Sequence, residues 1–390
     1  MNRAKNFIKN IAVLLIGIVL SFIILEGILR IYNPFESRVK GDKIVLPVNK
    51  EYIIENAKLR KRFQKSLKKF DDTIIHRKNS LGFRGEKPPR DFADYLTIVT
   101  VGGSTTECTF LSEGKTWTDV LGKKLKRKFN RLWINNAGFD GHSTFGHIIL
   151  MEDYIIKLKP DMVLFLVGAN DQDRQDIGEQ DMGIMRNQYV FYSMKSFLKS
   201  MANHSEVFSL GLNIYRYYKA KEIGVEHQEI DFENFRNVDV NQQFIDGKIR
   251  FEKEALRFRE SKLSQGYERR LKTLINISKD NNIEPVLLTQ PSLYGNFVDD
   301  VTNINFKFIS HAWDSLELFN DITRKVGAEE HVLVVDLARK MPKSTKYYYD
   351  WFHFTNEGAE KVAENIYNSL YPYMTVKYNK YMSLQETALQ

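Results

Sequence analysis

A serine, an aspartate and a histidine occur in this chain in contexts that suit nucleophilic catalysis. Ser104 lies in the segment Val-Gly-Gly-Ser-Thr-Thr, directly after the apolar run 95–101, which is typical of a buried strand. Asp350 and His353 lie three residues apart near the C-terminus, in Asp-Trp-Phe-His. A serine is a weak nucleophile until a histidine takes its proton, and the histidine needs a carboxylate that orients it. These residue types therefore indicate acyl-transfer chemistry.

Two further segments offer hydrogen-bond donors for such a reaction. Asn-Ala-Gly-Phe-Asp-Gly, residues 136–141, and Gly-Ala-Asn-Asp, residues 168–171, each follow a short apolar run. Acyl transfer builds negative charge on one oxygen, which preorganised N–H donors must meet. A glycine at a strand end lets a backbone N–H approach closely, and an asparagine side chain supplies a second donor. The chain thus presents a nucleophile, two oxyanion donors, an acid and a base, in that order.

These four segments together resemble the SGNH (GDSL-type) hydrolase family, over roughly residues 95–372. The resemblance implies that Ser104 is the nucleophile and that its own backbone N–H contributes to the oxyanion hole. It further implies that Gly141 and Asn170 are the other two oxyanion donors. Asp350 and His353 match the orienting acid and the general base of the family.

The first segment departs from the motif that names the family. Gly103 stands where that motif has aspartate, and Thr105 stands where it has leucine. Gly-Gly-Ser-Thr variants occur in membrane-anchored bacterial members, so the resemblance is to that branch and not to the lipase and thioesterase branches. An α/β-hydrolase elbow fits less well, because it needs Gly-x-Ser-x-Gly and position 106 is threonine.

Four more residues are expected to line the substrate pocket: Thr105, His142, Asp171 and Gln290. Gln290 follows a predicted strand, at the end where ligands bind in parallel sheets. His142 follows the expected oxyanion glycine, and a hydrogen-bonded structural role is the alternative for it and for His147.

The sequence indicates neither a metal site nor a cofactor. It has no His-Glu-x-x-His pattern and no carboxylate cluster, and its one cysteine, Cys108, excludes an intrachain disulfide and a multi-cysteine zinc site. Packing as a small apolar residue is expected for Cys108.

The N-terminal segment predicts a membrane anchor. Residues 11–25 are uncharged, and after Glu26 the run extends to residue 29, close to the roughly 20 residues that span a bilayer. Three basic residues precede the run, which predicts a cytoplasmic N-terminus and an extracytoplasmic body, periplasmic or at the cell surface. A cleaved signal peptide is the rival, although no Ala-x-Ala site follows. A buried core helix is the remaining alternative.

The expected organisation divides the chain into five parts. These are a cytoplasmic N-terminus (1–10), a transmembrane anchor (11–31), a basic juxtamembrane lead-in (32–94), a hydrolase domain (95–372) with an insertion at 172–264, and a C-terminal tail (373–390). The insertion suits a lid over the site or a structural appendage. Residues 57–70 hold seven Lys/Arg and no acid, which is typical of a segment that binds anionic lipid or of a solvated helix face. Nucleic-acid binding is not expected, because no recognised binding motif accompanies the charge.

The lead-in also contains Asn-Ser-Leu-Gly-Phe-Arg-Gly, residues 79–85. A similar Gly-Phe-Arg element precedes the first segment in membrane-anchored bacterial relatives. We therefore expect it to be an integral part of the hydrolase body.

Apolar runs at 95–101, 132–134, 162–167, 285–288 and 332–335 predict five buried strands. Helical patterns occur between and after them at 117–129, 146–158, 265–279, 312–326 and 356–370. This alternation predicts a doubly wound, flavodoxin-like parallel sheet in a three-layer α/β/α fold, behind an N-terminal transmembrane helix. The catalytic segments fall just past the strand ends, where such folds bind ligands.

Three functions remain open from the sequence. The leading one is a serine esterase that removes O-acyl groups, in particular O-acetyl, from cell-envelope or extracellular glycans through an acyl-enzyme. The second is an O-acyltransferase that uses the same triad and receives its acyl group from a membrane partner. The third is a catalytically silent, membrane-tethered glycan-binding protein, because fold alone does not determine function.

Overall fold

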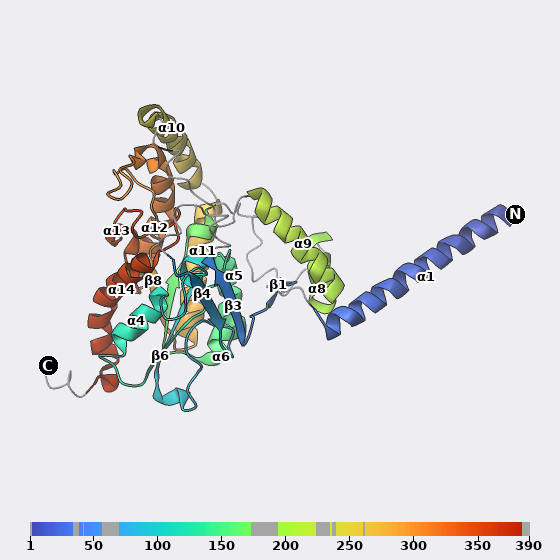
Figure 1. Ribbon diagram of the computed structural model, residues 1–390, viewed down its shortest axis with the longest axis horizontal. Helices are drawn as coiled ribbons and strands as arrows, with labels where there is room; N and C mark the ends of the chain where they lie inside the picture. Colours follow the sequence, from blue (N-terminus) through green and yellow to red (C-terminus); the bar gives the residue numbers. More distant parts are fainter. Residues whose placement is uncertain are drawn as a thin grey trace. The chain divides into compact units, whose positions relative to one another are not determined.

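The computed structural model describes residues 2–33, 39–41, 43–56, 70–172, 194–223, 235, 239–259 and 262–383. The chain divides into two compact units, Met1–Pro47 with Gln180–Glu226, and Val48–Glu179 with His227–Gln390 (Figure 1). The basic residues 57–69 and parts of the 172–264 insertion, among them 173–193 and 224–234, lie outside the described residues.

The larger unit is built on a parallel five-stranded sheet of order β6-β5-β7-β8-β9. Its strands are β5 (Leu96–Gly102), β6 (Leu132–Asn136), β7 (Met162–Leu166), β8 (Glu284–Leu288) and β9 (Leu333–Val335). Every residue of β5, β6 and β7 is buried, as expected of strands covered on both faces. The predicted parallel sheet of five strands is confirmed.

Helices cover both faces of the sheet. On one face α4 packs against α14, and on the other α11 packs against α5 and α12. Their bounds are α4 (Trp117–Leu125), α5 (Thr144–Leu150), α11 (Lys262–Asp280), α12 (Ser310–Glu329) and α14 (Asn356–Lys377). A further helix, α10 (Val240–Arg259), packs on α12. The helix predicted at 146–158 is interrupted by a π-helical turn, Met151–Ile155, before α6 (Ile156–Leu158).

The core side chains of α4 follow helical spacing. Trp117, Leu121 and Leu125 recur every four residues and are each 0% exposed. A capping box formed by Thr116 and Asp119 starts this helix, because each side chain satisfies a backbone N–H that the first turn leaves unpaired. Truncation of a buried leucine such as Leu121 to alanine is expected to cost about 2–5 kcal/mol.

The C-terminal helix begins where the sequence predicts but extends further than expected. Thr355 caps α14 by accepting from the N–H of Gly358. The helix then continues to Lys377, beyond the expected end near residue 370. Met374 and Tyr378 are buried, and Met382 pairs with Phe129, so apolar contacts hold this segment on the domain.

A lead-in hairpin precedes the sheet. Strands β3 (Lys50–Glu55) and β4 (Thr73–Lys78) pair antiparallel, and Ile74, His76 and Lys78 are buried on one face of β4. Arg84 then exchanges two backbone hydrogen bonds with Asn136 at the end of β6. The short strands β1 (Val39–Lys40) and β2 (Lys43–Ile44) pair with each other in the smaller unit.

The smaller unit contains α1 (Asn2–Ile31), α8 (Met194–His204) and α9 (Glu206–Ile223). Helix α1, drawn in blue in Figure 1, is apolar over Lys5–Ile31, with a mean hydropathy of 2.8 in a window that has no buried residues. Among the described helices it alone is long and apolar enough to cross a membrane, and an N-terminal signal sequence has the same properties. Helices α8 and α9 pack on each other, and α9 packs on α1.

Candidate active site

The expected nucleophile stands at a tight strand-to-helix turn. Strand β5 ends at Gly102, and Ser104 opens the short helix α3 (Ser104–Glu107). A Cβ atom on Gly102 would lie 2.1 Å from the Thr106 hydroxyl, and one on Gly103 would lie 2.5 Å from Nδ2 of Asn170. Only glycine fits either position.

Ser104, His353 and Asp350 form one chain of hydrogen bonds. The Ser104 hydroxyl lies 2.7 Å from Nε2 of His353, and Nδ1 of His353 lies 2.6 Å from Asp350. With the proton on Nδ1, His353 donates to the carboxylate and its Nε2 can accept the serine proton. The structure therefore brings Ser104 to His353, which lies 249 residues further along the chain and carries Asp350 with it.

Asp350 is held as a carboxylate. Its burial favours the neutral acid, but the charge and ring N–H of His353 and the backbone N–H groups of Phe352 and His353 outweigh burial and lower its pKa. These N–H groups donate to Asp350 at 2.9 and 2.7 Å. The ring of Tyr349 stacks on His353 at 5.5 Å, which fixes the imidazole from the side.

The two expected oxyanion donors lie in linked loops. Gly141 has a left-handed backbone (φ 72°), in a turn closed by a bond from His142 N–H to the Phe139 carbonyl at 3.1 Å. Asn170 lies in a short 3-10 turn after β7, and its Nδ2 donates to the His142 carbonyl at 2.8 Å. Asn170 also adjoins Gly103, so both loops meet beside the nucleophile.

Three of the four expected pocket residues have their polar atoms bonded inside the protein. Thr105 donates to the side chain of Gln290 at 3.3 Å, and these residues are 4% and 1% exposed. Asp171 is 0% exposed and accepts from the Thr144 hydroxyl at 2.6 Å. Gln290 and Asp171 therefore brace the loops of the site instead of facing solvent. His142 is half-buried and packs on the ring of Phe139.

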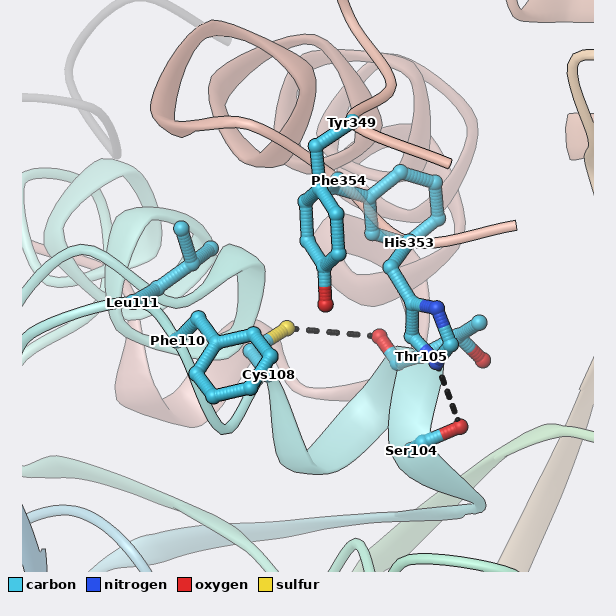
Figure 2. A pocket seen from close by; sticks show the side chains of 8 residues that line it. All are labelled: Ser104, Thr105, Cys108, Phe110, Leu111, Tyr349, His353 and Phe354. Carbon is cyan, nitrogen blue, oxygen red and sulfur yellow. Dashed lines mark hydrogen bonds between the residues drawn. The ribbon is translucent and has the colours of Figure 1, made fainter. Parts of the chain in front are cut away.

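A small pocket adjoins the nucleophile (Figure 2). It is a narrow hollow that opens to solvent. Its walls are Ser104, Thr105, Cys108, Phe110, Leu111, Tyr349, His353 and Phe354. Burial raises the pKa of the Cys108 thiol to about 12 and raises the pKa of Tyr349 well above its ordinary value, so both groups stay neutral. Ser104 and His353 therefore face a hollow whose other walls are neutral side chains.

No group of three or more His, Cys, Asp or Glu side chains that could hold a metal ion occurs in the part of the chain that the structure describes.

Comparison with known proteins agrees with this arrangement. Residues 100–220 match the model of the GDSL-like Lipase/Acylhydrolase family, and this segment includes Ser104, Gly141 and Asn170. The chain therefore contains a segment similar to GDSL-like acylhydrolases, over residues 100–220. It is thus an enzyme that acts on ester bonds. No curated protein matches the sequence.

The solved structures that are similar to this chain include the following two. One is an alpha/beta hydrolase enzyme from the metagenome of Lake Arreo, Spain, at 15% identity and a TM-score of 0.39, over 70% of this chain and 94% of that one. The other is an acetylxylan esterase from Geobacillus stearothermophilus, at 15% identity and a TM-score of 0.40, over 70% and 93% of the two chains.

A buried ion pair supports the loop that carries Gly141. Glu107, at the end of α3, accepts from the N–H of Asp140 at 2.6 Å and pairs with Lys78 of the lead-in hairpin at 2.8 Å. The two charged side chains are 4% and 2% exposed. Burial, followed by the charges of Arg84 and Lys78, lowers the pKa of nearby His76 to about 2, so that imidazole stays neutral. Glu107 therefore joins the nucleophile helix to the residue before Gly141.

Arg84 of the lead-in clamps the segment that follows the nucleophile. Its guanidinium is fully buried and donates to the carbonyls of Glu107, Cys108 and Leu111 at 2.7–2.8 Å. It also pairs with Glu113 at 2.6 Å. The Gly-Phe-Arg element is therefore an integral part of the larger unit, as expected.

A second buried cluster supports Asn170. Arg270 of α11 donates to the Thr144 hydroxyl at 2.6 Å, pairs with Asp171 at 3.3 Å, and lies 4.0 Å over the ring of Phe145. It ties the loop of Asn170 to the start of α5. Sequence reasoning did not identify Lys78, Glu107 or Arg270, because their partners lie on other elements.

Proposed function

We propose that this protein is a serine esterase that removes short O-acyl groups, principally acetyl, from glycans outside the cytoplasmic membrane. The observation that carries the proposal is the hydrogen-bonded chain Ser104–His353–Asp350 beside a narrow hollow. The hollow beside Ser104 is narrow, which favours a short acyl group over a long fatty acyl chain. The proposed esterase is of the membrane-anchored, Gly-Gly-Ser-Thr type of SGNH enzyme.

In the first half of the reaction, His353 Nε2 takes the proton of Ser104 while the serine oxygen attacks the ester carbonyl carbon. The carbonyl π electrons move to the oxygen, where the N–H groups of Ser104 and Gly141 and the Asn170 amide stabilise the charge. An amide carries two hydrogens, so the bond from Asn170 to His142 leaves one for the oxyanion. Collapse breaks the bond to the leaving alcohol, which receives its proton from His353.

In the second half, His353 deprotonates a water molecule that attacks the acyl-serine. The second tetrahedral intermediate collapses to release the carboxylic acid, and Ser104 regains its proton. Asp350 stays ionised throughout and stabilises the imidazolium that forms twice in each cycle. Its lowered pKa supports this role.

The location is proposed from α1. This helix is 27 residues long over Lys5–Ile31, about 40 Å at 1.5 Å per residue, which suffices to cross a bilayer. Basic residues at positions 3, 5 and 9 precede it, which favours a cytoplasmic N-terminus. We therefore propose an uncleaved single-pass anchor with the esterase on the extracytoplasmic side.

A glycan substrate is favoured by aromatic rings next to the triad. Trp351 and Phe352 lie between Asp350 and His353, and Tyr294 contacts both rings at 5.2 Å. All three rings are half-buried, so each keeps some surface toward solvent. Flat aromatic faces with polar edges suit sugar rings, which have apolar C–H faces.

The test is a comparison of p-nitrophenyl esters from acetyl to palmitoyl, and of acetate release from acetylated glycans, with the full chain in detergent. Acetyl should be the best acyl group, and Ser104→Ala should lower kcat by about 10³-fold or more. Ser80→Ala, at an exposed serine, is the matched control and should keep wild-type rates. Equal rates for Ser104→Ala and wild type would refute the proposal. Turnover that requires an added sugar acceptor would instead indicate acyl transfer.

A further inference from the structure

The apolar helix α1 contains one carboxylate, Glu26, which binds the start of α9. Glu26 accepts from the Ser205 hydroxyl at 2.7 Å and from the backbone N–H groups of Glu206 and Val207 at 3.1 Å each. The first N–H groups of a helix have no partner within the helix and carry the positive end of its dipole. A charge in an apolar span is costly unless it is paired, so these bonds explain why Glu26 is tolerated.

Further contacts hold the two helices together. Arg30, one turn after Glu26, pairs with it at 2.8 Å and donates to the carbonyl of His204, the last residue of α8, at 2.7 Å. The rings of Phe22 and Phe208 lie 5.6 Å apart. The junction of α8 and α9 is therefore attached to the last turns of α1.

Helix α9 presents an apolar face that the protein leaves exposed. Ile214, Tyr215 and Tyr218 are 49%, 57% and 66% exposed, and their spacing places them on one side of the helix. Ser205 and Ser209 are buried on the other side. Clustered exposed apolar side chains of this kind mark an interaction surface.

The composition of the hairpin indicates what covers this face. Residues 194–223 contain five Lys/Arg and two Asp/Glu, a net positive segment that complements anionic headgroups. Tyrosine is enriched at membrane–water interfaces, where its ring is apolar and its hydroxyl remains wet. Because the α8–α9 junction is bonded near the end of the span, the bilayer surface is the partner within its reach.

We propose that the α8–α9 hairpin is an interfacial membrane-binding element. Helix α9 lies in the headgroup region of the bilayer that α1 spans, with Ile214 and Tyr215 facing the acyl chains and anionic phospholipid as the partner. Interfacial helices of this kind bury their apolar face about 5–10 Å into the headgroup boundary. This inference rests on the anchoring proposed above, and it gives part of the 172–264 insertion a role at the membrane.

The test uses the full chain in vesicles of phosphatidylcholine and phosphatidylglycerol. Three variants would each carry a fluorophore on one introduced cysteine, at Leu20, Tyr215 or Ile245. Native Cys108 is buried at 7% exposure, so wild-type protein treated with the same fluorophore gives the background signal. Ile245 is the matched control, because it is 50% exposed on a helix of the larger unit. Lipids with a nitroxide near the headgroup or near the chain end report the depth of each label.

The inference predicts that headgroup nitroxide quenches the label at Tyr215 at least twofold more than the label at Ile245. Chain-end nitroxide should quench the label at Leu20 most. Glu26→Gln should reduce quenching at Tyr215 and leave quenching at Leu20 unchanged. If the label at Leu20 is quenched but the label at Tyr215 is quenched no more than the label at Ile245, the interfacial role is refuted and the anchor is not. An unquenched label at Leu20 overturns the anchor, and the interfacial role with it.

Discussion

The ion pair between Lys78 and Glu107 permits a quantitative prediction. Both side chains are almost fully buried, and Glu107 also binds the N–H of Asp140, the residue before Gly141. Glu107→Gln keeps the shape and an oxygen acceptor but removes the negative charge. Lys78 then remains buried without an anionic partner at 2.8 Å. The larger unit should become less stable, and the loop that carries Gly141 should be displaced.

The magnitude follows from burial. Removal of one partner of a buried ion pair costs about 3–5 kcal/mol. For a unit of roughly 300 residues, an unfolding entropy of about 2.1 cal/mol/K per residue converts this cost into a Tm lower by about 5–8 °C. A displacement of the oxyanion loop should lower kcat by about 10–100-fold and change KM little, because that interaction is made in the transition state.

Differential scanning fluorimetry and p-nitrophenyl acetate kinetics measure the two effects. Glu51→Gln is the matched control, since Glu51 pairs with Arg77 on the same hairpin with both side chains exposed, and such pairs contribute at most about 1 kcal/mol. The double variant Lys78→Met, Glu107→Gln should recover most of the lost Tm, because it leaves no buried charge.

Two results would refute this reasoning. Glu107→Gln with wild-type Tm and kcat would mean that the pair neither stabilises the fold nor positions the loop. A double variant no more stable than Glu107→Gln would mean that the unpaired charge of Lys78 is not the cause of the loss.

Three other changes test separate parts of the site. Gly103→Ala pushes a methyl group against Asn170 and should lower kcat for acetyl esters by about 10²-fold or more, measured in steady state; wild-type kcat would contradict the role of Asn170. Leu111→Ala enlarges the pocket and should move the preferred acyl chain from acetyl toward butyryl in the p-nitrophenyl ester series; an unchanged profile would exclude it as the acyl pocket. The folded state lowers the pKa of Asp350, so the stability from this carboxylate is present above about pH 4 and is lost as the pH falls through the folded pKa. The difference in free energy of unfolding between wild type and Asp350→Asn should therefore shrink on acidification, and urea titrations that give one difference at every pH would contradict this.

The sheet could be predicted because its strands are encoded locally. The strands are short apolar runs, most of them rich in Val, Ile and Leu, and a parallel sheet covered on both faces needs no alternation of polar residues. Helix ends were less predictable. The continuation of α14 to Lys377 depends on the contacts of Met374 and Tyr378 with the core, which local spacing does not report.

The triad residues could be proposed because their types and order are distinctive, whereas their supports could not. Lys78 lies on a strand rich in charged residues, where lysine is normally solvated. Its partner Glu107 lies on another element, and the pairing exists only once the hairpin packs on α3. Gln290 and Asp171 were expected to face the pocket because they follow strands. Residues of neighbouring loops also lie at a strand end, and here Thr105 and Thr144 form hydrogen bonds with these two side chains.

The smaller unit was predictable only at its N-terminus. The apolar run of α1 indicates a membrane segment by itself. The partner of Glu26 was not predictable, because Ser205 is 179 residues away and the carboxylate appeared only as a charge near the end of the run.

The most direct test of the central claim is covalent labelling with a fluorophosphonate followed by peptide mapping. A serine activated by His353 should form one adduct per chain, located on Ser104, and His353→Ala should slow its formation by about 10³-fold or more. An adduct on a different serine, or continued ester hydrolysis by a chain fully labelled at Ser104, would contradict the account.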